Sequence, residues 1–102
     1  MADELIAKID RARMPPILDV VATLTSDDFC TIESAREDEV LLRWADAPRR
    51  SNWPEDFSLS VIQDGLLLSI HAGTRDQRAS IIARIEAYLS KTADCPVMFD
   101  DE

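Results

Sequence analysis

The clearest hydrophobic pattern in the chain lies between residues 57 and 72. Phe57, Leu59 and Val61 alternate with polar residues, which is the period of a strand with one buried face. A second apolar run covers residues 66–71, and Asp64-Gly65 lies just before it. Asp-Gly favours a two-residue type I′ turn, because both central positions need positive φ. The pattern predicts a β-hairpin over residues 57–72.

This turn also predicts a register for the hairpin. It places Val61 opposite Leu68 and, further from the turn, Ser58 opposite His71. A slip of one residue would set serines against leucines and move one apolar set to the wrong face. Two apolar side chains beside the turn fall on the polar face, where they form a small exposed patch or are covered by another segment: Ile62 and Leu67.

An amphipathic helix is predicted over residues 74–92. Thr74 and Gln77 match a capping box, in which each side chain binds the backbone N–H of the other residue. The predicted buried stripe follows helical spacing, and its members are Ile81, Ile82, Ile85, Tyr88 and Leu89. Arginines, including Arg84, lie mostly on the opposite side.

The N-terminal residues 1–25 predict helical structure interrupted by two prolines. Residues 3–13 place apolar side chains on one face of a short helix, namely Leu5, Ile6, Ile9 and Ala12. Pro15 or Pro16 begins a second helical segment that reaches about Leu24, because proline suits the first helical position. The pattern leaves open whether these are one kinked helix or two separate ones.

Residues 29–45 predict a first hairpin, with strands at Phe29–Ser34 and Glu39–Ala45 and a turn at Ala35–Asp38. The inward side chains are expected to be Cys30, Ile32, Val40, Leu42 and Trp44. Glu33 and Arg43 face outward, where a cross-strand ion pair is worth about 0 to 1 kcal/mol. Residues 46–56 lack periodicity and predict a loop. In the tail, residues 93–102, Val97 to Phe99 form a short edge strand or pack as an arm.

Assembled, these elements predict a single α+β domain over residues 1–102 with two layers. Sequential hairpins usually form a meander, so we expect a four-stranded antiparallel meander sheet. Because one face of each strand is apolar, the N-terminal and C-terminal helices are expected to pack on one face.

Composition narrows the setting of this domain. The chain has 102 residues and a formal net charge of −9. A surface with this charge repels nucleic acids and anionic membranes and attracts basic proteins. The acidic N-terminus does not resemble a signal peptide, so we expect a cytoplasmic protein. Cys30 and Cys95 fit no metal spacing and are expected to be free and buried.

Signals for catalysis are sparse. His71 is the sole histidine, so an acid–base or nucleophilic constellation would have to use it. The two glycines, Gly65 and Gly73, form no phosphate loop, and the acidic runs lack the spacing of a calcium loop. The expectation is a non-enzymatic protein with no cofactor and no metal. Histidine-based catalysis is a minor alternative.

The candidate contact residues for a protein partner are an acidic hairpin tip and a basic, aromatic part of the loop: Glu37, Asp38, Glu39, Arg49, Arg50 and Trp53. Acidic surfaces steer basic partners, and Trp and Arg are frequent interface hot spots. The alternatives without a binding role are that the acidic hairpin tip is simply solvated and that Trp53 packs on the rim of the sheet. Acids flanking the two arginines oppose binding of nucleic-acid phosphate.

Three segments carry a resemblance to known proteins: Leu66–Arg75, Ile81–Leu89 and Val97–Asp101. In these segments and in its overall plan the chain resembles the small immunity proteins of bacterial toxin systems. That resemblance implies an acidic, cytosolic, non-enzymatic α+β protein that neutralises a cognate toxin by binding it. A secretion chaperone or adaptor for an exported protein is the alternative, and either a monomer or a homodimer is compatible with the sequence.

Overall fold

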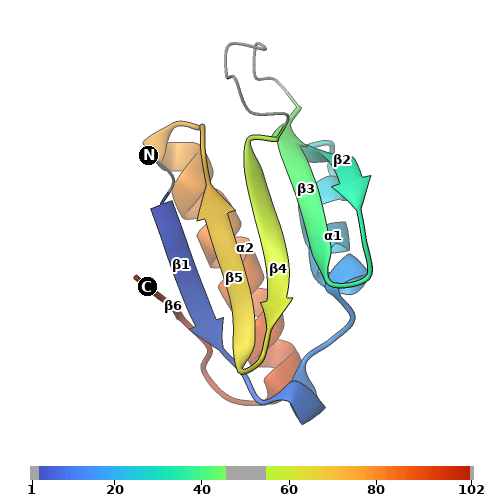
Figure 1. Cartoon of the computed structure of the whole chain (residues 1–102). Helices are drawn as coiled ribbons and strands as arrows, with labels where there is room; N and C mark the ends of the chain where they lie inside the picture. Colours follow the sequence, from blue (N-terminus) through green and yellow to red (C-terminus); the bar gives the residue numbers. More distant parts are fainter. Residues whose placement is uncertain (1–2, 46–54, 102) are drawn as a thin grey trace.

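The computed structural model describes residues 3–45 and 55–101, and within them the chain forms an antiparallel sheet with its helices on one face (Figure 1). In chain order the elements are β1 (Asp3–Lys8), the 3-10 turn η1 (Arg11–Arg13), α1 (Ile17–Thr25), β2 (Cys30–Ala35), β3 (Glu39–Trp44), β4 (Phe57–Ile62), β5 (Gly65–Ile70), α2 (Arg75–Ala93) and β6 (Phe99–Asp101). The predicted α+β class is confirmed.

The sheet has six strands in the described residues, in the order β2-β3-β4-β5-β1-β6. The predicted strand count of four is therefore wrong. Strands β2 to β5 do form the expected meander, but β1 from the N-terminus pairs with the far side of β5, and β6 pairs with β1. The chain ends thus supply two strands of the same sheet.

Strand β1 replaces the helix predicted over residues 3–13. Leu5 and Ala7 are buried, and they alternate with exposed or partly exposed neighbours. Ile6 gave this segment a helix-like apolar grouping, although its side chain lies on the opposite face from Leu5 and Ala7. The pairing with β5 and β6 decides the outcome, because a central strand gains hydrogen bonds along both sides. Only Arg11–Arg13 keeps helical structure, as a 3-10 turn.

The hairpin β4–β5 forms, but its register differs by two residues from the prediction. Leu59 pairs with Leu68, Ser58 with Ser69, and the turn consists of Gln63 and Asp64. Among the described residues positive φ occurs at Asp28, Gly73 and Asp94 and not in this turn, so the predicted type I′ turn is wrong. A shift of two residues keeps every side chain on its predicted face, and Phe57 and Leu59 are fully buried.

Gly65 is required for close strand packing rather than for the turn. A Cβ atom built there would lie 2.0 Å from the carbonyl oxygen of Ala7 in β1. Gly65 pairs with Lys8, and the adjacent N–H of Ile9 donates to Asp64 O at 3.0 Å. The glycine therefore admits β1 beside the start of β5.

The hairpin β2–β3 lies at the other side of the sheet. Val40, Leu42 and Trp44 are buried as predicted, and the Arg43–Glu33 ion pair forms at 3.1 Å. Ile32 pairs with Leu42 and lies on the core side as predicted, but it is not covered there, since the residue is 46% exposed.

A bulge interrupts the β2–β3 ladder between Ile32 and Ser34. In β2 only Cys30 is buried. Within the described residues, β2 is paired on one side only, by β3, and its residues after Cys30 are exposed although α1 lies against the strand. The bulge and the polar side chains also make this edge a poor template for pairing with another strand.

Both helices form as expected and close the core. Pro16 is the N-cap of α1, which runs from Ile17 to Thr25. The capping box of Thr74 and Gln77 begins α2. The fully or nearly fully buried side chains of the helices follow the predicted spacing: Ile17, Val20, Val21, Leu24, Ile81, Ile85 and Leu89. Burying one such aliphatic side chain contributes about 1.5 to 3 kcal/mol.

Candidate functional site

The acidic tip, defined as Glu37, Asp38 and Glu39, connects β2 to β3. Glu37 and Asp38 are exposed, whereas Glu39 is partly buried at the start of β3. The backbone is fixed on both sides, because Arg36 N donates to Glu39 O at 2.7 Å and Val61 N donates to Asp38 O at 2.7 Å. The tip thus presents carboxylates from a hydrogen-bonded turn.

Glu39 is the member of the acidic tip that faces the open side of the sheet, the side without helices. Its Oε2 accepts a hydrogen bond from Ser60 Oγ at 3.2 Å, across the β3–β4 ladder. One carboxylate of the tip is therefore held above the sheet surface, and the other two extend from its end.

Arg49, Arg50 and Trp53, the other predicted contact residues, lie outside the described residues. The chain leaves β3 at Ala45 and is described again from Glu55. Because β3 runs for six residues, Glu39–Trp44, about 17 to 20 Å separates the acidic tip from Trp44 at the end of the strand. The prediction of a joint acidic and basic contact surface remains a prediction.

A buried polar cluster joins the two hairpins at the end of β3. Asp56 is only 7% exposed, and its Oδ2 accepts the backbone N–H of Trp44 at 2.9 Å. Its carbonyl oxygen accepts the N–H groups of His71 and Ala72 at 2.8 and 3.1 Å, and Trp44 Nε1 donates to Ala72 O at 2.8 Å. Asp56, which falls in the segment predicted as a loop, thus connects β3 to the residues that follow β5.

His71 also belongs to this end of the sheet. Its Nε2 lies 3.5 Å from Glu55 Oε1, and both side chains are about nine-tenths buried. The prediction that His71 faces Ser58 is wrong, because Ser58 pairs with Ser69. The structure therefore does not bring His71 and Ser58 together as the predicted register did.

The two cysteines differ in environment. Cys30 is buried, and desolvation raises the pKa of its thiol to about 12. Because the thiolate is the reactive form, the raised pKa disfavours reaction at this thiol, which packs in the core. Cys95 is free but exposed, so the expectation that it is buried is wrong. It follows the end of α2, close to the guanidinium of Arg13.

Arg84 has a role that the sequence pattern did not reveal. Its two terminal nitrogens bind the carboxylate of Asp27 at 3.0 and 2.9 Å, and its guanidinium lies 4.3 Å from the ring centroid of Phe29. These hydrogen bonds lower the pKa of Asp27 and raise that of Arg84. The contact ties α2 to the turn before β2, which no local pattern could predict because the partners are 57 residues apart.

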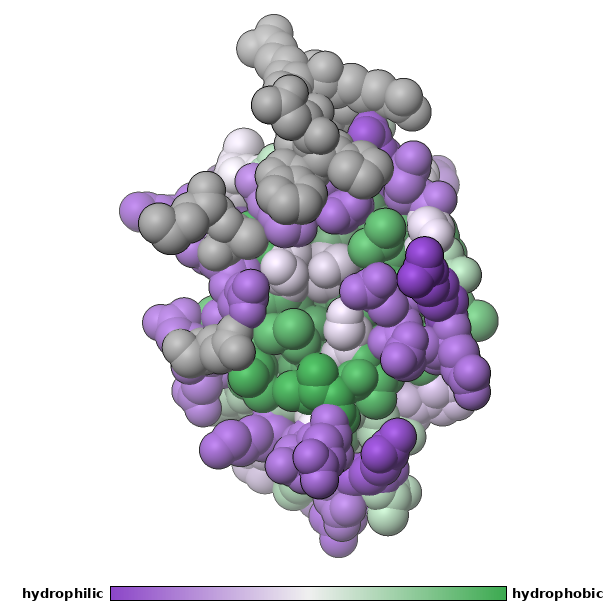
Figure 2. Space-filling view, in the orientation of Figure 1, coloured by the Kyte–Doolittle hydropathy of each residue, from purple (hydrophilic) through white to green (hydrophobic). Residues whose placement is uncertain are grey.

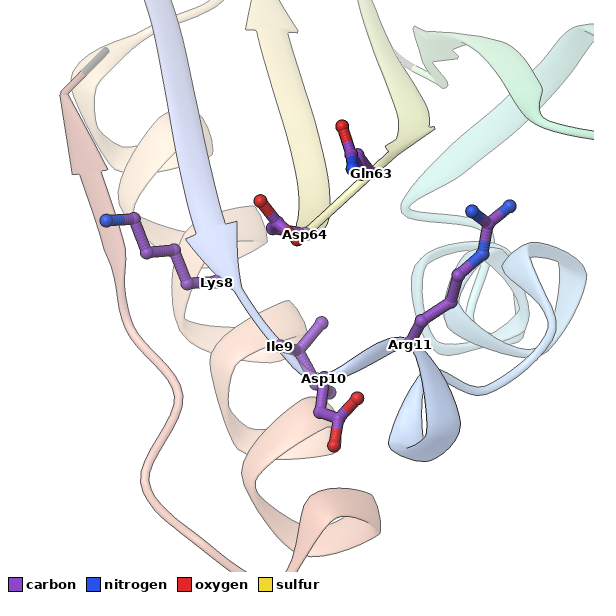
Figure 3. A pocket seen from close by; sticks show the side chains of 6 residues that line it. All are labelled: Lys8, Ile9, Asp10, Arg11, Gln63 and Asp64. Carbon is purple, nitrogen blue, oxygen red and sulfur yellow. The ribbon is translucent and has the colours of Figure 1, made fainter.

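A surface hollow of about 330 Å³ lies where β1 passes into η1 beside the β4–β5 turn (Figure 3). Its lining residues are Lys8, Ile9, Asp10, Arg11, Gln63 and Asp64. The side chains of Lys8 and Arg11 extend away from each other on either side of it (Figure 3). Two cations and two carboxylates balance here, so the hollow does not select a strongly charged ligand.

The described part of the chain also bears on metals and membranes. Across residues 3–45 and 55–101, no three His, Cys, Asp or Glu side chains are grouped so that they could hold a metal ion. Neither described helix combines the length and apolarity needed to span a bilayer.

Comparison with protein-family models, curated proteins and solved structures found no significant match for this chain.

Proposed function

We propose that this chain is a non-enzymatic protein-binding domain that docks a basic protein through its acidic tip. In its specific form the proposal is a cytoplasmic immunity protein that neutralises a cognate bacterial toxin by direct contact. The observation that carries the proposal is the position of three consecutive acidic residues, Glu37, Asp38 and Glu39, at an ordered turn of a chain with net charge −9.

The physical argument starts from electrostatic steering. A protein that acts on nucleic acid has a basic cleft, and carboxylates can occupy that cleft in place of phosphates. An ordered acidic turn loses little conformational entropy on binding. The hydrogen bonds to Val61 and Ser60 support this role, since they hold the tip before any partner arrives.

The first experiment is co-expression of the tagged chain with the product of the adjacent gene. The proposal expects an equimolar complex and rescue of cells that the adjacent product would otherwise inhibit. A stable homodimer that keeps an exported protein soluble would indicate a secretion chaperone instead. Recovery of the tagged chain alone, repeated with every plausible neighbour, contradicts both functions.

The second experiment measures association kinetics with that partner. Asp38→Lys is expected to slow association about tenfold at low ionic strength and to flatten its salt dependence, because steering is screened by salt. The matched control is Asp76→Lys, which makes the same charge change in the exposed first turn of α2. It should change the association rate by less than about twofold. Equal effects of the two substitutions would contradict docking at the acidic tip.

A further inference from the structure

The open side of the sheet carries an apolar patch, which we call the open-face patch: Ile6, Leu41, Ile62 and Leu67. Each is partly exposed and alternates along its strand with residues of the buried core. Figure 2 shows this hydrophobic area on the side of the sheet without helices, bordered by hydrophilic residues. The sequence pointed to Ile62 and Leu67 alone, because Ile6 was assigned to a helix.

The strand register arranges this face into rows that cross the sheet. One row consists of Glu39, Ser60, Leu67, Ile6 and Asp100 in β3, β4, β5, β1 and β6. Its centre is apolar or small, and each end is a carboxylate. The Glu39 carboxylate bound by Ser60 connects this row directly to the acidic tip.

The neighbouring rows differ in composition. In one, Leu41 pairs with Ser58, Ser58 with Ser69 and Ser69 with Glu4, so a second carboxylate borders the β1 side. Ile62 pairs with Gly65, which pairs with Lys8. Ser60 and Ser69, which lie between the larger side chains of this face, are partly exposed, whereas Ser58 and Gly65 are buried.

The geometry limits what can occupy this face. Strands β4, β5 and β1 each pair on both sides, so a partner packs on side chains and does not add a strand there. The three strands span about 10 Å, which matches the diameter of an α-helix with its side chains. An amphipathic helix is therefore the element that fits.

Charge selects the chemistry of that helix. Around the patch, the acidic residues Glu4, Glu39 and Asp100 outnumber the basic residues Lys8 and Arg43, and Arg43 is paired with Glu33. Two copies packed through this face would bring their carboxylates together at a net charge of −9 each, which opposes self-association. Lysines or arginines beside an apolar stripe would complement the face.

We infer that the open-face patch docks an amphipathic helix of a partner protein, with its apolar stripe on Leu67 and Ile6 and its flanking Lys or Arg side chains on Glu4, Glu39 and Asp100. The inference rests on the proposed function, since it supplies the desolvated contact that a basic partner makes after the acidic tip has steered it. Affinity then resides mainly in the apolar centre and the association rate in the tip.

The test uses a defined probe, a synthetic amphipathic helical peptide of Leu and Lys about four turns long. Amide chemical-shift changes of the full chain are expected to cluster in β1, β4 and β5. Leu67→Ser should raise the dissociation constant for the peptide at least about tenfold, as loss of an interface anchor does. Leu18→Ser is the matched control, because Leu18 is 55% exposed on α1 in the helix layer, and it should change the constant by less than about twofold.

Ile62→Ser provides a second patch variant if Leu67→Ser fails to fold, and thermal unfolding reports this for each variant. Equal effects of Leu67→Ser and Leu18→Ser, or shift changes confined to the helices or to the tip, overturn the inference. Concentration-dependent shifts without peptide, together with sedimentation as a dimer, would assign the patch to a second copy and also overturn it. If Asp38→Lys slows association of the cognate partner while patch variants bind it normally, the proposed function stands and this inference fails.

Discussion

The hairpins β4–β5 and β2–β3 have strands of equal length but opposite roles. The first is central, with β3 on one side and β1 on the other, and Phe57, Leu59 and Leu68 in it are fully buried. In the second, β2 forms the sheet edge, carries a bulge and buries only Cys30. Similar apolar positions are thus buried in β3, β4 and β5 but exposed after Cys30 in the edge strand β2.

The difference shows that the position of a strand in the sheet determines how much a substitution in it affects stability. A central strand is constrained on both edges and on its core face, so substitutions there cost stability. The edge strand β2 has fewer such constraints, although β3 is paired on both sides and buries Val40, Leu42 and Trp44. The exposed turn between the two strands, which holds the acidic tip, can carry charge at little cost in stability.

The largest expected effect tests the central hairpin. Leu59→Ala should lower the free energy of unfolding by about 3 kcal/mol, because it leaves a cavity between the sheet and the helices. Ile32→Ala in β2 is the contrasting control and should cost less than about 1 kcal/mol, since its side chain is 46% exposed. Urea unfolding of both variants measures the difference. Similar losses for the two would break the distinction between the hairpins.

A somewhat smaller effect is expected at the contact between β5 and β1. Gly65→Ala should lower the free energy of unfolding by about 2 kcal/mol, because its Cβ would meet the Ala7 carbonyl oxygen at 2.0 Å. That loss outweighs the gain of about 0.4 to 1 kcal/mol that the same substitution brings where it fits. Ser69→Ala on the same strand serves as control, within about 0.5 kcal/mol. A stabilised Gly65→Ala variant would show that β1 does not pack closely there.

The smallest effect concerns the attachment of β2 to the helix layer. Arg84 lowers the pKa of Asp27 below 3.8, so this carboxylate stabilises the fold above pH 3.8 and loses that contribution as the pH falls through its folded pKa. Asp27→Asn should therefore lower the urea midpoint slightly at neutral pH, and the difference should shrink in acid. Asp28→Asn removes the same charge without removing the Arg84 pair. If the urea midpoints of the unsubstituted protein and the Asp27→Asn variant differ by the same amount at every pH, this would contradict the ion pair.

Much of the fold could be predicted from local patterns. The capping box of Thr74 and Gln77, the start of α1 after Pro16 and the alternation in β4 depend on neighbours within a few residues. The N-terminal segment could not be predicted in this way. Leu5, Ile6 and Ile9 suit a helix as an isolated segment, and only β5 and β6, about 60 and 95 residues away along the chain, supply the hydrogen bonds that make it a strand.

The candidate site, like the fold, could be predicted only in part from the sequence. The acidic run at residues 37–39 is visible in the sequence, and the structure adds that Ser60 holds Glu39. The open-face patch was found only in part, because Ile6 joins Leu67 through a strand pairing that the sequence did not indicate. The predicted register placed His71 opposite Ser58. The observed register differs by two residues, and His71 lies beside Glu55 instead.

By itself the sequence determined which side chains are apolar, where helices α1 and α2 begin and that the surface is strongly acidic, because these properties depend on residue type and short-range spacing. Tertiary structure decided that the N-terminus is a strand, that Gly65 admits it, and which apolar side chains stay at the open surface. Those outcomes depend on contacts between segments far apart in the chain, whose free energy no local pattern contains.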